Sequence, residues 1–245
     1  MRETAGLLIR SARSHTVARR RAASDRAFDA ARSVDTAAWV RRVDLVTDSP
    51  NRAHADRYQP SSVEEFEQLV DKLSVVPEEF VFVDYGSGKG RVLMLAADLG
   101  FKQVIGVEFS PPLHRIAQAN IATLGEDAAR IETVLLDAEE FEPPLEPLVL
   151  YFFNPFAAPV MRGVLMRVRA SLERRPRAAY IVLSGRPELA DAVEEAGFEP
   201  LEVDDRGWAT QGVYAAPRAL RGDSPGHDDA APPEGGTALV GDTTR

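Results

Sequence analysis

The chain has 245 residues, of which 44% are hydrophobic and 27% are charged, a composition typical of one globular domain. It contains no cysteine, which excludes disulfides, thiolate catalysis and cysteine-ligated metals, and its four scattered histidines lack metal-ligand spacing, so we expect no metal. The formal net charge of −9 argues against attraction of the whole surface to nucleic acid or to an anionic membrane.

The N-terminal part of the chain differs in charge from the rest. Residues 1–47 carry ten arginines and five acids, a net charge of +5, so the remaining residues carry −14. Apolar residues at helical spacing predict one or two helices there, which we interpret as a basic arm that covers the following domain. The favoured interpretation is a solvated arginine-rich helix that docks on its own acidic domain. Binding of a nucleic acid through this arm is the less favoured alternative.

Residues 48–216 are predicted to form the main domain, after a turn at Asp48–Asn51. Ser61 lies three residues before Glu64 and precedes an apolar stripe, which predicts a helix that begins with a capping box. From Phe80 onward, short apolar runs alternate with helical patterns, which is typical of parallel strands with crossover helices.

The predicted strands are Phe80–Asp84, Val104–Glu108, Ile131–Leu136, Leu148–Phe153, Ala179–Leu183, Glu199–Val203 and Gly207–Ala215. The predicted helices between them are Gly90–Leu99, Pro112–Leu124, Pro159–Leu172 and Pro187–Ala196. The last two strands follow one another without a helix and fit an antiparallel hairpin at the sheet edge. The fold class is therefore α/β, a Rossmann-like, doubly wound and mostly parallel seven-stranded sheet.

Residues 217–245 hold four prolines and five glycines with few apolar residues, which predicts a disordered tail. No apolar run approaches the ~20 residues that span a bilayer. The apolar stretch at residues 6–9 is too short for the core of a signal peptide. We therefore expect a cytoplasmic protein without a membrane partner, and the oligomeric state stays open.

A glycine-rich turn follows the first predicted strand of the sheet. Asp84, Gly86, Gly88 and Gly90 form the pattern Asp-x-Gly-x-Gly-x-Gly, directly before a helix. Such a turn lets the backbone approach a nucleotide-like ligand closely. A phosphate-binding P-loop would need Ser or Thr after Lys89, and a dinucleotide fingerprint would need glycine at position 91. Neither alternative fits.

This pattern resembles that of the class I S-adenosylmethionine-dependent methyltransferases, and the resemblance covers about residues 26–215. It implies S-adenosylmethionine as the cofactor. Glu108 ends the neighbouring strand and is expected to accept hydrogen bonds from the ribose hydroxyls. Asp137 ends the third strand and is implied to lie near the adenine amino group, the alternative being a cap for the following turn. The predicted cofactor-binding residues are Asp84, Gly86, Ser87, Gly88, Gly90, Glu108, Asp137 and Asn154.

The acceptor side is predicted from two further segments. Asn154-Pro155-Phe156 resembles the Asn-Pro-Pro-Tyr/Phe motif of amine-directed methyltransferases, with one proline missing. The resemblance implies that Asn154 orients the acceptor and that Phe156 stacks on it, the alternatives being a turn residue and a core residue. Tyr58 precedes Pro60 by two positions, as in bacterial members whose Tyr-x-Pro segment packs over the pocket. Asn154, Pro155, Phe156 and Tyr58 are therefore the catalytic candidates.

The predicted function is methyl transfer to an unidentified acceptor. Whether the acceptor is an amine of a protein, of a nucleic acid or of a small molecule stays open. Tyr58 and Tyr151 are candidates for a general base by residue type alone. The alternative is a module that binds S-adenosylmethionine without catalysis and serves interaction or sensing.

Overall fold

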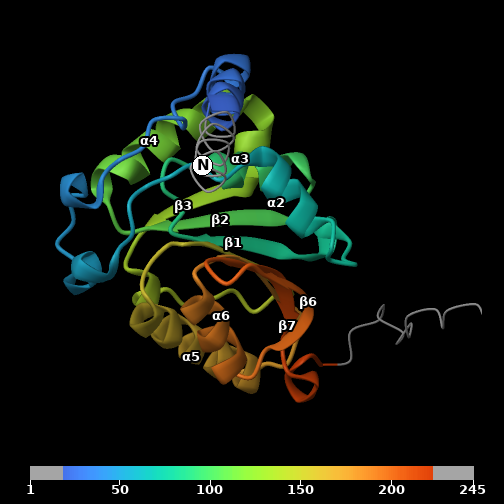
Figure 1. The fold of residues 1–245 in the computed structure, drawn as a ribbon. Helices are drawn as coiled ribbons and strands as arrows, with labels where there is room; N and C mark the ends of the chain where they lie inside the picture. The colour runs from blue at the N-terminus through green and yellow to red at the C-terminus, as the bar shows by residue number, and fades with distance from the viewer. Residues whose placement is uncertain (1–18, 223–245) are drawn as a thin grey trace, which may run out of the picture.

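The computed structural model describes residues 19–222 (Figure 1). They form one seven-stranded sheet with the strand order β3-β2-β1-β4-β5-β7-β6. The strands are β1 (Val81–Tyr85), β2 (Gln103–Glu108), β3 (Ile131–Leu135), β4 (Leu148–Phe153), β5 (Ala179–Gly185), β6 (Glu199–Asp205) and β7 (Thr210–Ala215). Strands β1 to β5 are parallel, whereas β7 runs antiparallel to both β5 and β6. The predicted fold class is confirmed.

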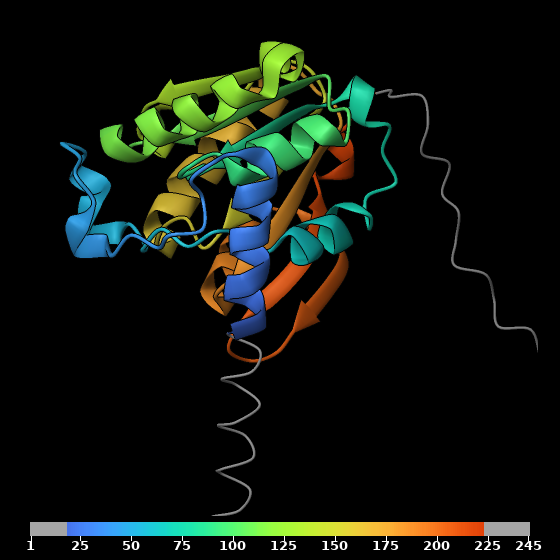
Figure 2. The same cartoon turned by 90° about the horizontal axis from the view of Figure 1, so that it is seen from above.

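Helices cover both faces of the sheet (Figure 1). On one face lie α5 (Ala158–Arg174) and α6 (Pro187–Glu195), whose apolar residues form one core cluster with the sheet. On the other face lie α2 (Val63–Val70), α3 (Arg91–Asp98) and α4 (Pro111–Ile121), with a second cluster. A helix over residues 19–32 lies outermost on this second face, as Figure 2 shows.

Short 3₁₀ helices occupy several of the connections. They are η1 (Arg42–Asp44), η2 (Pro50–His54), η3 (Pro77–Glu79), η4 (Ala122–Arg130), η5 (Ala138–Glu140) and η6 (Arg218–Leu220). No helix within residues 19–222 is long and apolar enough to cross a membrane.

The start of α2 differs from the prediction. The N-cap is Ser62, whose hydroxyl accepts from the backbone N–H of Glu65. Ser61 instead lies buried below the helix, where its hydroxyl accepts from Tyr151 at 3.2 Å and its carbonyl accepts from Arg91 at 3.3 Å. These contacts hold Ser61 outside the helix, so the capping box predicted from Ser61 and Glu64 does not form.

The N-terminal segment forms one helix and then an extended stretch. Asp29 explains why the helix ends, because its carboxylate accepts from the backbone N–H groups of Thr36 and Ala37, each at 2.7 Å. The chain therefore folds back after residue 32, and Val40 pairs with Tyr58 in an isolated β-bridge. A second long helix before residue 47 is absent from the described residues, and the predicted arm before residue 19 lies outside them.

The start of the predicted tail is ordered. Residues 218–220 form η6, and the carbonyl of Leu220 accepts from the backbone of Arg177 at 2.9 Å. Leu220 packs against the core, and Arg221 forms an ion pair with Glu199. The prediction of disorder is thus wrong for residues 217–222, because these contacts offset the conformational entropy that is lost when a short segment is ordered. The rest of the predicted tail lies outside the described residues.

Candidate functional site

A cavity opens at the carboxyl ends of the central strands. Including its open mouth it encloses about 860 Å³. The glycine turn, the ends of β2 and β3, the loop after β4 and part of the segment before α2 form its walls. The predicted residues that line it are Tyr58, Asp84, Gly86, Ser87, Gly88, Glu108, Asp137, Asn154, Pro155 and Phe156.

The three glycines of the turn serve different purposes. Their φ angles are +83°, +56° and +83°, in the left-handed region that L side chains rarely adopt. A Cβ at Gly86 would lie 2.7 Å from the side chain of Pro155, and one at Gly88 would lie 2.4 Å from the ring of Tyr58. Gly90 does not line the cavity; it is the N-cap of α3 and lies against Ala117 of α4. Gly90 is therefore placed for packing, whereas Gly86 and Gly88 shape the cavity.

Two buried carboxylates face this cavity. Glu108 accepts from the backbone N–H groups of Gly88 and Ser110, each at 2.8 Å. Burial raises the pKa of Glu108 to about 7, although these N–H groups act in the opposite direction. Asp84 is 4% exposed, and its carboxylate forms no hydrogen bond or ion pair with the described residues. Burial and the nearby Glu108 raise the pKa of Asp84 well above its ordinary value.

Buried carboxylates that lack a cation favour a ligand that brings one. Glu108 can still accept hydrogen bonds from hydroxyl groups, because each carboxylate oxygen has a second lone pair. Asp84 is suited to a positively charged group. The pair therefore fits a ligand with hydroxyls at one end and an ammonium at the other.

Asp137 lies at the cavity wall but is already strongly hydrogen-bonded. It accepts from the hydroxyl of Ser49 and from the side-chain amide of Asn51, and it caps η5 through the backbone N–H of Glu139. The capping alternative is thus present in the structure, and contact with an adenine stays a prediction. Ser49 and Asn51 belonged to a segment that the sequence marked only as a turn, so their role in holding this wall was missed.

The loop after β4 has evident structural roles. Asn154 has a φ of +42°, and its Oδ1 accepts from the backbone N–H of Arg186 at 3.0 Å. Phe156 is 7% exposed and packs edge-on against Phe152 at a centroid distance of 6.3 Å. Pro155 lies against the glycine turn at Gly86. The turn and core alternatives are therefore realised, and a role toward an acceptor stays a prediction.

Neither tyrosine suggested as a base is suited to that task. The hydroxyl of Tyr58 donates to the carbonyl of Thr36 at 2.8 Å, and that of Tyr151 donates to Ser61 inside the core. Burial raises the pKa of Tyr58 and of Tyr151 above the usual value for tyrosine, which disfavours the phenolate that a base requires. Tyr58 instead presents its ring to the cavity beside Gly88.

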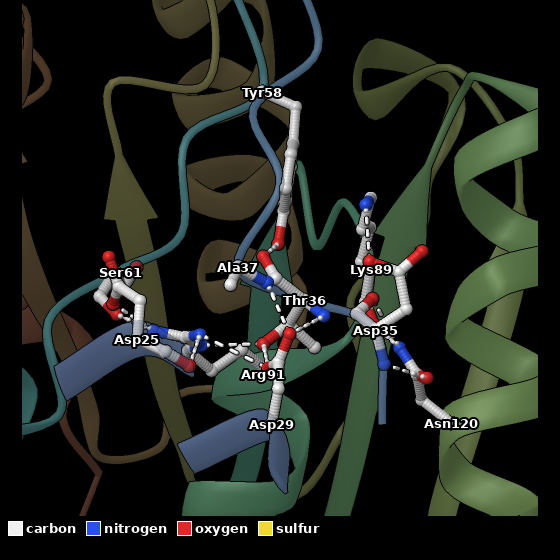
Figure 3. A network of polar contacts seen from close by, with 10 residues as sticks. All are labelled: Asp25, Asp29, Asp35, Thr36, Ala37, Tyr58, Ser61, Lys89, Arg91 and Asn120. Carbon is white, nitrogen blue, oxygen red and sulfur yellow. Dashed lines mark hydrogen bonds and ion pairs between the residues drawn. The ribbon is translucent and has the colours of Figure 1, made fainter. Parts of the chain in front are cut away.

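The residues that fasten the N-terminal segment over the glycine turn were not found from sequence (Figure 3). Arg91, the first residue of α3, is 2% exposed and forms ion pairs with Asp25 and Asp29 of the N-terminal helix. Lys89 pairs with Asp35 at 2.9 Å, and Asn120 of α4 donates to the backbone carbonyls of both of these residues. The N-terminal segment is thus attached to the glycine turn itself and to the start of α3.

Comparison with known proteins agrees with this geometry. A family described as a methyltransferase domain matches residues 83–147. A ribosomal protein L11 methyltransferase of Deinococcus radiodurans is 29% identical over 150 residues, which cover 58% of this chain and 53% of the relative. The chain thus spans about half the length of that relative.

Solved structures share the fold at low sequence identity. The glycopeptide N-methyltransferase MtfA superimposes with a TM-score of 0.52 at 14% identity, covering 65% of this chain and 92% of its own. A putative methyltransferase, yhhF of Escherichia coli, gives a TM-score of 0.50 at 16% identity, with coverages of 64% and 88%. A geranyl diphosphate methyltransferase gives a TM-score of 0.50 at 15% identity, with coverages of 64% and 85%.

The seven-stranded fold and the glycine turn are similar to those of the class I methyltransferases, and a methyltransferase domain matches part of the chain. The predicted resemblance to the S-adenosylmethionine-dependent members of this class is confirmed by the domain match and the relative.

Proposed function

We propose that this chain transfers a methyl group from S-adenosylmethionine to a nucleophilic acceptor. The pair of buried carboxylates, Asp84 and Glu108, beside the glycine turn supports this function most directly. S-Adenosylmethionine carries ribose hydroxyls, which can donate to Glu108, and a methionine ammonium, which can donate to Asp84. The related fold of geranyl diphosphate methyltransferase was solved in complex with SAM, which agrees with the proposal.

In this reaction the chain's residues bind and align rather than react. Glu108 accepts from the ribose hydroxyls, Asp84 accepts from the ammonium, and the backbone at Gly86 and Gly88 lies close to the ligand. The acceptor's lone pair forms a bond to the methyl carbon while the carbon–sulfur bond breaks and its electron pair stays on sulfur. Such an in-line displacement depends on alignment at about 3 Å and on exclusion of water. Tyr58 and the loop after β4 line the cavity, and the proposal places the entry of the acceptor on their side.

Binding of S-adenosylmethionine without catalysis is the second candidate. Two observations favour it: Oδ1 of Asn154 accepts from the backbone N–H of Arg186, and Phe156 belongs to the core. The loop after β4 can then be explained by folding alone. The two candidates agree on cofactor binding and differ only in turnover.

Calorimetry with S-adenosylmethionine tests the shared part of the proposal. The wild type is expected to bind, and Gly88→Val is expected not to, because the new side chain meets the ring of Tyr58. Tyr58→Ala is the matched control, since it enlarges the cavity on the same side without closing the turn. No binding by the wild type, or full binding by Gly88→Val, would refute the proposal.

Transfer of labelled methyl groups tests the remaining part. Proteins, RNA and small amines are offered as acceptors in parallel, each with the wild type and with Gly88→Val. Label that enters one acceptor class only with the wild type supports catalysis. Cofactor binding without transfer to any class favours the binding module.

A further inference from the structure

A second hollow adjoins the cofactor cavity. Four arginines line it, together with His54 and Asp56, and we call it the arginine groove; they are Arg41, Arg42, Arg57 and Arg186. Including open solvent it encloses about 780 Å³. Ala55, Asp56 and Arg57 line both the groove and the cavity, so the two share a wall.

That wall is fixed to the loop after β4. Ala55 and Phe156 form an isolated β-bridge, the carbonyl of His54 accepts from the backbone of Ala157 at 2.8 Å, and the backbone of Asp56 donates to the carbonyl of Pro155. The loop predicted to meet the acceptor therefore lies between the cavity and the groove. A molecule that enters the cavity from this side passes the arginine groove.

The groove has a surplus of positive charge on an acidic protein. Arg186 pairs with Asp56 at 2.8 Å and with Glu188 at 3.0 Å, and Arg41 pairs with Asp44 at 2.7 Å at a strongly exposed position. Arg42 and Arg57 form no ion pair with any residue between 19 and 222. The chain as a whole carries −9, so this surplus is local. Guanidinium groups in an open groove favour phosphate or carboxylate groups.

An exposed aromatic ring beside the groove narrows the choice of ligand. Trp39 is 51% exposed, and the guanidinium of Arg57 lies 4.7 Å from its ring centroid. In Figures 1 and 2 the blue segment that contains η1 and η2 stands out from the side of the body. An aromatic ring next to a basic groove is the combination that binds single-stranded nucleic acid, since the ring stacks on a base while the arginines contact phosphates. A free phosphate has no group that stacks on the ring.

We propose that the arginine groove binds the phosphate backbone of a single-stranded nucleic acid that carries the methyl acceptor. This inference rests on the proposed function, because the groove would guide one nucleotide of that strand toward the cofactor cavity. Arg41 and Arg42 belong to the basic segment 1–47, for which nucleic-acid binding was the less favoured alternative, whereas Arg57 and Arg186 come from the following domain.

Fluorescence anisotropy with labelled single-stranded RNA and DNA of about ten nucleotides tests the inference. The test variant is Arg41→Glu/Arg42→Glu, because neither residue lines the cofactor cavity. Its matched control is Arg174→Glu/Arg175→Glu, an adjacent exposed pair of which Arg174 is likewise ion-paired, at the opposite end of the sheet. Both variants change the charge equally, so a general electrostatic effect would appear in both.

The wild type is expected to bind the oligonucleotide with an affinity that falls as salt rises. The test variant should bind at least about tenfold more weakly and should lose roughly 1.4 from the slope of log affinity against log salt. The control variant should match the wild type, and both variants should keep the wild-type affinity for S-adenosylmethionine and the wild-type melting temperature. Equal binding of the oligonucleotide by the test and control variants would refute the proposed site at the arginine groove.

Two competitors separate the possible ligands. Polyglutamate that displaces the oligonucleotide at equal charge concentration would overturn the nucleic-acid assignment in favour of an acidic peptide. Inorganic pyrophosphate that does so would overturn it in favour of a small phosphorylated acceptor. If the protein binds the cofactor but its binding of the oligonucleotide does not depend on the groove, the nucleic-acid site at the groove is refuted and the proposed methyl transfer is not. The converse result, oligonucleotide binding without cofactor binding, refutes the proposed methyl transfer.

Discussion

The pH dependence of cofactor binding depends on Glu108. Burial raises the pKa of Glu108 to about 7, and ribose hydroxyls that donate to its carboxylate select the ionised form. A carboxyl group with this pKa is ionised in about ten of eleven molecules at pH 8 and in about one of eleven at pH 6. Affinity is reduced by the fraction of molecules in the competent state, so it should fall roughly tenfold from pH 8 to pH 6. The affinity rises with pH through the pKa and levels off above it.

The assay is calorimetry at several pH values on the wild type and Glu108→Gln. At pH 8 the variant is expected to bind about 10- to 150-fold more weakly, because a charge-assisted hydrogen bond is lost. Its pH dependence should shrink to the part contributed by Asp84, whose pKa is also raised. Cofactor that lacks the 2′-hydroxyl should bind the wild type much more weakly and the variant little more weakly. The same pH slope in both proteins, or equal losses on removal of the hydroxyl, would show that Glu108 does not contact the ribose.

Three further predictions concern Asp84, Arg91 and Asn154. Folding raises the pKa of Asp84, so the folded state loses stability as the pH rises above the pKa of Asp84 in the unfolded chain. Without ligand at pH 8, Asp84→Asn should therefore melt at a higher temperature than the wild type. This difference in melting temperature should shrink toward pH 4. Arg91→Met leaves Asp25 buried without its cation and should lower the free energy of unfolding by ~3–5 kcal/mol in urea titrations, and a wild-type midpoint would contradict this. Asn154→Ala should lower the melting temperature, because the N–H of Arg186 loses its acceptor, and should keep a cofactor affinity near wild type. A fall in turnover of roughly 30- to 1,000-fold per folded molecule would show that Asn154 contacts the acceptor, and full turnover would exclude that role.

The sheet could be predicted because parallel strands buried on both faces appear as continuous apolar runs. Leu148–Phe153 is such a run, and its bounds agree with those of β4. The position of the cavity could be predicted because alternating glycines between a buried strand and a helix indicate a backbone that a ligand approaches closely. Glutamate at the end of the neighbouring strand then had to lie close to the turn. These inferences use only local sequence and the geometry of parallel strands.

The hydrogen-bond partners of the site residues could not be predicted in this way. Ser49 and Asp137 are 88 residues apart, and Arg186 and Asn154 are 32 apart. Ser, Asn and Asp have side chains that can cap a turn or bind a ligand equally well, so residue type does not separate the two roles. Only the tertiary arrangement shows which donor reaches which acceptor.

The N-terminal helix shows why net charge is a poor guide to docking. The prediction was that an arginine-rich helix docks on an acidic body, and Arg32 does pair with Asp98 of α3. The most deeply buried ion pairs of residues 19–32, however, join the acids of the helix to Arg91 of the body. Asp25 and Asp29 are four residues apart and therefore lie on one face of the helix, and Phe28 lies beside them with its ring 4.7 Å from the guanidinium of Arg91. An arginine that faces water contributes to the net charge of the segment but not to its docking, because a surface charge is well solvated. The face that carries the apolar residue, rather than the sum of charges, determines which polar residues are buried with it.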